Sequence, residues 1–258
     1  MPLIRSALFA FILLLITPVF ATVALLSSPF APHRRYKLIG GWTSIAMWFI
    51  RHLLGIRHRV IGAHNIPTQA AVVLCKHQSA WETIALQRIL PPICFVLKRE
   101  LLRLPFFGWG LARMPTIAID RAAGKDALAQ VVEQGRERLA EGFCVVVFPE
   151  GTRVAPGTTR RYKPGGAWLA SHTGAPVVPV AHNAGEFWRR NAFVKTPGEI
   201  IVSIGPVIDS AGLTTEQINT QAEAWIEAEM RRLFPHHYAA GEARTVTSPV
   251  ADRGSEGV

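Results

Sequence analysis

The N-terminal part of the chain is its most apolar part. An uncharged stretch runs from Ala7 to Leu26, interrupted only by Pro18, and is about as long as a helix needs to cross a hydrocarbon core. We expect a membrane element here. The alternative is a cleaved signal peptide, since Arg5 precedes the stretch and Val19–Ala21 resembles a cleavage site. The apolar run continues past that site, which favours an anchor.

A second apolar segment, Leu38–Leu54, is rich in aromatic residues and flanked by arginines. This pattern is typical of an interfacial or re-entrant helix, and the alternative is an ordinary buried core helix. Arg5 is the cation that precedes the first segment. More cations lie between the two segments: His33, Arg34, Arg35 and Lys37. This bias predicts that the following domain faces the cytoplasm.

Short apolar runs alternate with helical patterns from about Val60 onward, which predicts an α/β domain with a mixed, largely parallel sheet flanked by helices. The expected strands are 71–75, 93–97, 143–148, 177–180 and 199–204, and the expected helices are 79–89, 123–140, 165–172 and 215–233. We therefore expect membrane-associated helices over 1–59 and one domain over 60–238. Residues 239–258 are small and polar, so we expect a disordered tail.

Charge narrows the class of partner. The chain is 49% hydrophobic, yet its 28 lysines and arginines exceed its 18 acidic residues, giving a net charge of +10. Apolar and basic character together indicate a membrane surface or another anionic partner. Nucleic acid is not expected, because zinc-finger spacing, RNA-binding aromatic motifs and long basic runs are lacking. Cys75, Cys94 and Cys144 lie in apolar runs and are interpreted as reduced structural thiols.

The stretch Lys76–Glu82 lies where an expected strand ends and a helix begins, the usual place for sites in open α/β sheets. His77 and Glu82 would point apart on one continuous helix, so they meet only if His77 lies on the preceding turn. Ser79 as N-cap would start the helix between them. A carboxylate that orients the imidazole would then make His77 a general base, with no protein nucleophile required.

The same residues have a purely structural interpretation. Ser79 and Glu82 match a capping box, in which Glu82 only accepts a hydrogen bond from the Ser79 amide. A second stretch, Phe148–Arg153, favours the catalytic interpretation, because a strand runs directly into a carboxylate, a glycine and an arginine. A turn explains the glycine but not the charged residues.

Together these motifs resemble the glycerolipid acyltransferase family, specifically its 1-acylglycerol-3-phosphate acyltransferases. Four blocks follow the family's order: His77 with Glu82, Ile119–Arg121, Phe148–Arg153 and Val178–Val180. Smaller matches occur at Lys98 with Glu100 and Leu101, in the Pro105–Gly108 turn, and at Tyr162–Gly165. The resemblance spans roughly residues 60–208.

The resemblance implies transfer of a fatty acyl group from a thioester to the sn-2 hydroxyl of 1-acylglycerol 3-phosphate, giving phosphatidic acid. It implies that His77 is the base, that Glu82 orients it, and that the substrate meets Lys98, Arg121, Glu150, Gly151, Thr152 and Arg153. For Glu150 a supporting ion pair with an arginine is favoured over a second catalytic carboxylate. The donor, acyl-coenzyme A or acyl-acyl carrier protein, is already activated, so neither cofactor nor metal is expected.

The chain departs from the family pattern at two places. Glu82 stands where the family usually has aspartate, and Pro115-Thr116 stand where a glycine is usual, which bears on headgroup preference. Another lysophospholipid, a glycolipid precursor, or non-catalytic binding of anionic lipid remain alternatives. The remaining candidate residues are interpreted as structural or solvated: His182, His236, His237, Arg160, Arg161 and Lys163.

Overall fold

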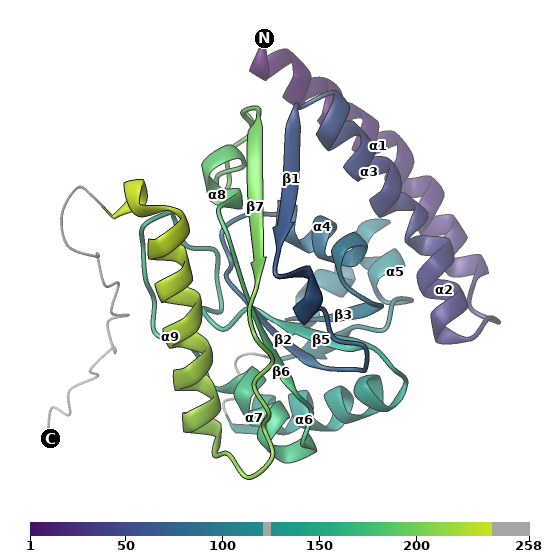
Figure 1. Cartoon of the computed structure of the whole chain (residues 1–258). Helices are drawn as coiled ribbons and strands as arrows, with labels where there is room; N and C mark the ends of the chain where they lie inside the picture. Colours follow the sequence, from purple (N-terminus) through teal and green to yellow (C-terminus); the bar gives the residue numbers. More distant parts are fainter. Residues whose placement is uncertain (121–124, 239–258) are drawn as a thin grey trace, which may run out of the picture.

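A seven-stranded sheet forms the centre of the computed structural model, which describes residues 1–120 and 125–238 (Figure 1). Its order is β1-β7-β6-β2-β5-β3-β4. The strands are β1 Ile56–Ile61, β2 Val72–Cys75, β3 Ile93–Lys98, β4 Ile117–Ile119, β5 Cys144–Val147, β6 Val177–His182 and β7 Gly198–Ile204. Strands β2 to β6 are parallel, whereas β7 is antiparallel to β6 and pairs in parallel with β1. The expected mixed, largely parallel sheet is confirmed.

Helices cover both faces of the sheet. The α-helices are α1 Pro2–Leu26, α2 Pro32–Ile39, α3 Gly41–His52, α4 Trp81–Ile89, α5 Phe107–Leu111, α6 Lys125–Ala140, α7 Gly165–Thr173, α8 Ala184–Phe187 and α9 Thr215–Leu233. Short 3-10 helices are η1 Ala63–Asn65, η2 Arg99–Arg103 and η4 Pro235–His237. One core receives side chains from α1, α3 and α4, and the other from α6, α7 and α9. The layering is that of an α/β domain.

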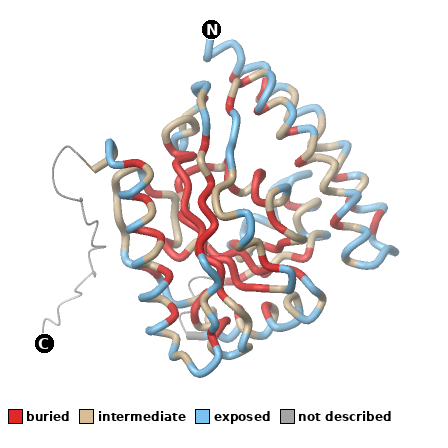
Figure 2. The backbone as a smooth tube through the Cα atoms, viewed as in Figure 1, coloured by how far each residue is buried: buried red, intermediate tan, exposed pale blue. Residues whose placement is uncertain are grey.

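The central strands are buried on both faces, as the tube coloured by burial shows in Figure 2. In β2, Val73 and Cys75 enter the first core, and Val72 and Leu74 enter the second. This division follows from the two-residue period of a strand, in which successive side chains point to opposite faces. A continuous apolar run is therefore what a central parallel strand requires.

Helix α1 lies along the edge of the domain beside α3 (Figure 1). Near its start, Ser6 Oγ accepts a hydrogen bond of 2.9 Å from the Lys195 amide, and Phe9 packs edge-on against Trp188 with ring centroids 5.8 Å apart. Near its end, Ala21 and Ala24 are buried. Within the described residues, α1 is the helix that meets the length and hydropathy expected of a membrane span.

The sequence did not predict the strands β1 and β4 or the short helices α2, α5 and α8, and helix α3 differs from its expected segment. The edge strand β1 includes Arg57, His58 and Arg59, so its polar sequence gave no strand signal, and the expected boundary at residue 60 falls inside it. Strand β4 has three residues, too few for a periodic pattern. Helix α3 is shorter than the expected segment and combines both interpretations, because Ile50 is buried and Trp48 is 56% exposed. The expected tail, 239–258, lies outside the described residues.

Close packing of α7 on the sheet predicts a difference between two adjacent glycines. A Cβ on Gly166 would lie 2.4 Å from Leu74 Cδ2, whereas one on Gly165 would meet only Leu128 Cδ2, at 3.8 Å. We expect Gly166→Ala to lower the free energy of unfolding by about 1–3 kcal/mol, the usual cost of overpacking. Gly165→Ala, the control, leaves it unchanged or slightly higher. Chemical denaturation in detergent measures both, and equal stabilities would contradict the packing described.

Candidate active site

The turn between β2 and α4 brings His77 and Glu82 together. His77 Nδ1 lies 2.8 Å from Glu82 Oε1. The same oxygen accepts hydrogen bonds from the backbone amides of Gln78, at 2.9 Å, and Ser79, at 2.7 Å. The Glu82 side chain is fully buried, whereas that of His77 is 14% exposed. The predicted geometry, with His77 on the turn and a first-turn carboxylate facing it, is confirmed.

Glu82 makes the contact expected in each of its two interpretations, because the oxygen that accepts a hydrogen bond from the Ser79 amide also lies beside His77 Nδ1. The expected N-cap at Ser79 is wrong: helix α4 begins at Trp81, with Ala80 as N-cap. The bond from the Ser79 amide to the Glu82 carboxylate is the one a capping box requires, but the Ser79 hydroxyl does not accept the reciprocal bond from the Glu82 amide. Ser79 Oγ still accepts a hydrogen bond from the Trp81 amide, at 3.1 Å.

A second histidine, His182, lies beside the pair on the neighbouring strand β6. Its Nε2 donates to the Lys76 carbonyl at 2.7 Å, and its Nδ1 accepts from the Ala184 amide at 3.2 Å. These partners fix a neutral tautomer, and burial lowers the pKa of His182 accordingly. Nε2 also lies 4.0 Å from Glu82 Oε1. The sequence indicated a structural histidine but not this location, because only the pairing of β2 with β6 creates it.

The pKa of Glu82 is set by competing effects. Burial raises the pKa, but the neighbouring His182, the hydrogen bond from His77 and the backbone amide of Ser79 lower it by more than burial raises it. The net result is a pKa below the usual value of a glutamate, so the carboxylate is ionised at neutral pH. An ionised Glu82 accepts the Nδ1 proton of His77 and leaves Nε2 as the basic nitrogen of the ring.

The stretch Phe148–Arg153 encloses the other side of His77. The imidazole stacks on the Phe148 ring with centroids 3.9 Å apart, and the His77 carbonyl accepts a hydrogen bond from the Val154 amide at 2.8 Å. No residue of the described chain hydrogen-bonds His77 Nε2. A ring held at Nδ1 and along one face, with Nε2 unengaged, is suited to accepting a proton.

Glu150 supports the turn from inside the protein. Its side chain is fully buried, lies 2.8 Å from Lys76 Nζ, and accepts a hydrogen bond of 2.7 Å from the His77 amide. Lys76 Nζ also donates to Glu227 of α9, at 2.6 Å, and Tyr162 donates to the same Glu227 oxygen, at 3.0 Å. The expected arginine partner was wrong, because the cation that is buried beside Glu150 is Lys76.

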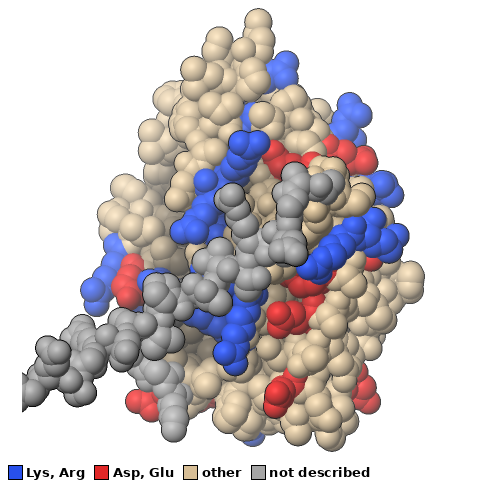
Figure 3. Space-filling model, turned by 90° about the vertical axis from the view of Figure 1, so that its left-hand side faces the viewer, with Lys and Arg blue, Asp and Glu red and all other residues tan. Residues whose placement is uncertain are grey.

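The other expected substrate contacts lie around the mouth of this site. Lys98 is exposed at the carboxyl end of β3, and Thr152 and Arg153 are partly exposed. Gly151 adopts a φ of +70° with the Lys163 side chain close by, which favours glycine here. Arg121 lies outside the described residues. Arg190, which the sequence did not single out, donates to the Arg153 carbonyl at 3.0 Å. Figure 3 shows lysine and arginine side chains in a band across the face that carries α9.

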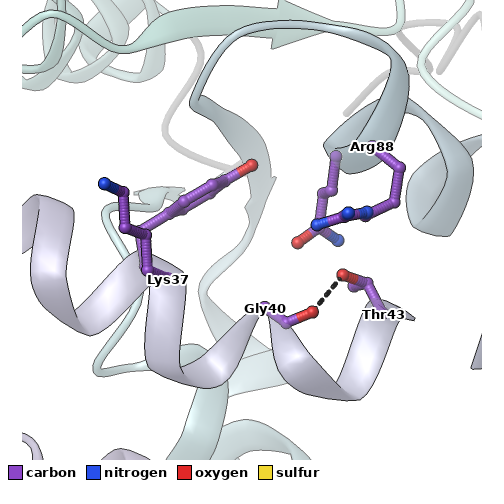
Figure 4. Close-up of a pocket in the computed structure, with 6 residues that line it drawn as sticks. Lys37, Gly40, Thr43 and Arg88 are labelled. Carbon is purple, nitrogen blue, oxygen red and sulfur yellow. Dashed lines mark hydrogen bonds between the residues drawn. The ribbon is translucent and has the colours of Figure 1, made fainter. Parts of the chain in front are cut away.

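Two further groups of residues contain none of the expected site residues. A pocket at the far end of α4 is lined by Tyr36, Lys37, Gly40, Thr43, Gln87 and Arg88 (Figure 4). It lies a helix length away from Glu82. Separately, His236, His237 and Asn183 all lie within 3.3 Å of Glu186 Oε1. The possible metal-ligand atoms of Glu186 and the two histidines lie within 4.8 Å of one another. The sequence did not indicate this cluster, because Glu186 is far from the two histidines in the chain. The Glu186 carboxylate already accepts a hydrogen bond from Asn183.

Comparisons with known proteins agree with this arrangement. Residues 57–183 match the acyltransferase family. The 1-acyl-sn-glycerol-3-phosphate acyltransferase of Pseudomonas aeruginosa is 43% identical over 90% of this chain and 92% of its own length. The chain belongs to the 1-acylglycerol-3-phosphate acyltransferase family.

More distant members of the family are also similar. The human 1-acyl-sn-glycerol-3-phosphate acyltransferase alpha is 33% identical over 67% of this chain and 62% of its own length. The crystal structure of the 1-acyl-sn-glycerophosphate acyltransferase of Thermotoga maritima superimposes with a TM-score of 0.74, covering 90% of this chain and 95% of that one at 22% identity. The fold, including the apolar N-terminal helix, is therefore that of the family.

The buried Glu150 predicts a specific dependence of stability on pH. Burial raises its pKa from 4.5 to about 7, although Lys76 opposes the shift. The folded protein thus holds this proton more tightly than the unfolded chain, and ionisation of Glu150 destabilises the fold as pH rises between these two values. We expect the melting temperature of the wild type, minus that of Glu150→Gln, to fall from about pH 5 to about pH 8.

The control for this prediction is Glu133→Gln, an exposed carboxylate on α6. Its melting temperature should follow that of the wild type at a constant difference over the same range. Differential scanning fluorimetry in detergent measures all three proteins. A constant difference for Glu150→Gln as well would mean that Glu150 titrates normally in the folded protein.

Proposed function

We infer that this chain is an O-acyltransferase that moves a fatty acyl group from an acyl thioester to the sn-2 hydroxyl of 1-acylglycerol 3-phosphate, yielding phosphatidic acid. The observation that carries the proposal is the His77–Glu82 pair, held at one sheet edge with the stretch Phe148–Arg153 against it. The names of the relatives support the same reaction and acceptor.

The geometry supports the following mechanism. His77 Nε2 takes the proton of the acceptor hydroxyl while the hydroxyl oxygen attacks the carbonyl carbon of the thioester. The tetrahedral intermediate collapses by breaking the carbon–sulfur bond, and the thiolate leaves with the proton from the imidazolium. Glu82 stays ionised throughout, fixing the ring through Nδ1 and stabilising its positive charge. The acyl thioester arrives activated, so the proposal requires no cofactor.

The acceptor phosphate is proposed to lie among the cations at the mouth of the site. Arg153 follows directly on the buried Glu150 and is partly exposed, so its guanidinium is placed to form paired hydrogen bonds with phosphate oxygens. Lys98 and Arg121 follow neighbouring parallel strands of the same sheet and are proposed as further contacts. Glu150 is proposed to act as a scaffold for the turn rather than by touching substrate.

The position of α1 supports attachment to one face of a membrane rather than a span. Both its ends pack on the domain, at Phe9 and at Ala24. A span would carry one end about 30 Å away across the hydrocarbon core. Its outward stripe of exposed residues is apolar, comprising Leu8, Phe11, Leu15, Val19 and Leu26. We place this stripe in a lipid leaflet, with the cations of α2 at its anionic headgroups and the domain on the cytoplasmic side.

The first test of the function is the general base. We expect His77→Ala to lower acceptor-dependent thioester release by roughly 100- to 10,000-fold, the usual contribution of a positioned base. The control is His172→Ala. His172 is exposed in the last turn of α7, at the end of the sheet where β6 begins. Circular dichroism checks both folds. Equal turnover in wild type and His77→Ala would contradict the role of His77 as the base. No turnover in any of the proteins, with coenzyme A or acyl carrier protein donors, would favour a lipid-binding protein without catalysis.

The second test concerns the acceptor. Arg153→Ala should raise the KM for 1-acylglycerol 3-phosphate by roughly 10- to 100-fold, as the loss of a charge-assisted hydrogen bond to phosphate does. Arg136→Ala, an exposed arginine on α6, serves as the control and leaves KM unchanged. Steady-state assays with a panel of lysophospholipids and an acylated glycolipid measure both. A preference for an acceptor without phosphate would contradict the assignment.

A further inference from the structure

The segment from η2 to α5 exposes large apolar side chains to an unusual degree. Five of them lie within nine residues, and their exposed fractions are 39% for Leu101, 46% for Leu104, 47% for Phe106, 46% for Phe107 and 45% for Trp109. A contiguous apolar patch of this kind is uncommon on a soluble surface and marks an interaction site. We call these five residues the α5 patch.

The α5 patch lies at the catalytic edge of the sheet. Strands β2, β5 and β3 are parallel neighbours, with Leu74 opposite Val147 and Phe95 opposite Val146. His77 and Phe148 follow the carboxyl ends of β2 and β5, and Lys98 is the last residue of β3, so η2 begins beside the active site. A stack of rings links the two regions, because His77 packs on Phe148 and Phe148 lies 5.9 Å from Phe95 of β3.

The segment that carries the α5 patch packs against the inward face of α1. Helix α5 packs on the C-terminal half of α1, where a Cβ on Gly110 would lie 3.8 Å from Ala21 and 3.9 Å from Ala24. The exposed residues Leu25 and Leu26 lie in the same part of α1. The C-terminal end of α1 therefore brings exposed apolar side chains close to α5.

The backbone holds the α5 patch in a fixed shape. Phe106 adopts a φ of 59° and a ψ of −62°, the rare and strained form of the γ-turn, and the Phe107 amide donates to the Pro105 carbonyl at 2.6 Å. Gly108 is buried, and a Cβ there would lie 2.6 Å from the Leu101 carbonyl oxygen, so the chain folds tightly on itself. Strain of this kind persists only where the surroundings enforce it. Here it turns the ring of Phe106 outward, 5.1 Å from that of Trp109.

Exposed cations precede, interrupt and follow the α5 patch along the chain. Lys98, Arg99, Arg103 and Arg113 are all exposed, and Glu100 is the acidic residue among them. An apolar centre with a basic border complements the surface of a bilayer, whose acyl chains lie beneath anionic headgroups. A protein partner would account for the apolar residues but would not by itself require contact with α1.

We propose that the α5 patch is a second membrane-docking element, which enters the same lipid leaflet as the outer stripe of α1. The two elements then contact the bilayer at separate places and fix the tilt of the domain. With the α5 patch in the leaflet, the carboxyl ends of β2, β3 and β5 lie at the depth of the lipid headgroups. Resting on the proposed function, this places the hydroxyl of a lysophospholipid within reach of His77 while its acyl chain stays in the membrane.

Binding to vesicles tests the docking without any assay of activity. We compare the wild type with Leu104→Ser/Phe107→Ser/Trp109→Ser, which leaves α1 intact, and with Val207→Ser, a 48% exposed valine after β7, as control. Vesicles contain phosphatidylcholine and about 30% phosphatidylglycerol, the anionic lipid that the basic border requires. We expect the triple variant to partition at least about fivefold more weakly, with unchanged circular dichroism, and the control to partition like the wild type.

Lipids brominated on the acyl chains test the same point with a gentler substitution. Bromine quenches the fluorescence of a tryptophan that enters the acyl-chain region. We expect these lipids to quench the wild type more than Trp109→Phe, because the variant lacks the tryptophan that lies in the leaflet. Unquenched Trp109 in vesicle-bound protein, or equal partition of the triple variant and the wild type, would overturn the proposal. The proposal would also be overturned if the triple variant had a lower mass than the wild type in detergent but the same partition into vesicles. That result would mean that the α5 patch pairs two copies of the chain.

Activity then separates this proposal from the proposed function. The triple variant should lose turnover at least about fivefold on lysophosphatidate presented in vesicles, yet retain it on a short-chain acceptor dissolved below its micellar concentration. Equal losses on both acceptors would mean damage to the site itself and would contradict a docking role. If the wild type turned over neither acceptor, the proposed function would fail, whereas partition and quenching would still decide whether the α5 patch enters the membrane.

Discussion

One carboxylate oxygen, Oε1 of Glu82, organises the turn on which the site depends. It accepts hydrogen bonds from the amides of Gln78 and Ser79 and from the ring of His77. A buried carboxylate without such partners would be costly, whereas these donors hold it ionised in the interior. The backbone of the turn, the start of α4 and the orientation of the imidazole are therefore set by the same interaction, and none of them is free to change alone.

A second buried network fixes this turn relative to the rest of the domain. Lys76 precedes the histidine and bridges Glu150, after β5, with Glu227, on α9. Burial alone would lower the pKa of Lys76, but the two carboxylates raise it above its usual value, so the lysine remains charged. Removing one partner of such a cluster leaves a buried charge unpaired. The strand ends that carry the site are thus tied to the last helix of the fold.

The membrane-facing elements complement this rigid centre. The apolar stripe of α1 and the α5 patch lie on elements packed against each other, and the segment that carries the α5 patch leaves β3 at the edge where His77 lies. An acyltransferase of this family acts on a substrate with a polar head and an apolar tail. A site at the headgroup level, next to surfaces that dissolve in lipid, meets both requirements without extracting the substrate into water.

Much of the fold was readable from the sequence. Strands β2 and β5 are short, continuous apolar runs, and α9 has a helical period that begins after a capping box at Thr214. These are local signals, set by side-chain spacing. The polar edge strand β1 and the three-residue β4 carry no such signal, since they are strands only because β7 and β3 offer partners.

The candidate site divides in the same way. The sequence by itself determined that His77 and Glu82 would meet across a turn, because five residues of spacing and a helix start fix that distance locally. Tertiary structure alone decided that Lys76 would pair with Glu150 and Glu227, that His182 would lie beside Glu82, and that the α5 patch would adjoin α1. These contacts join residues far apart in the chain, and strand order, register and helix packing set them, which no local pattern of side chains encodes.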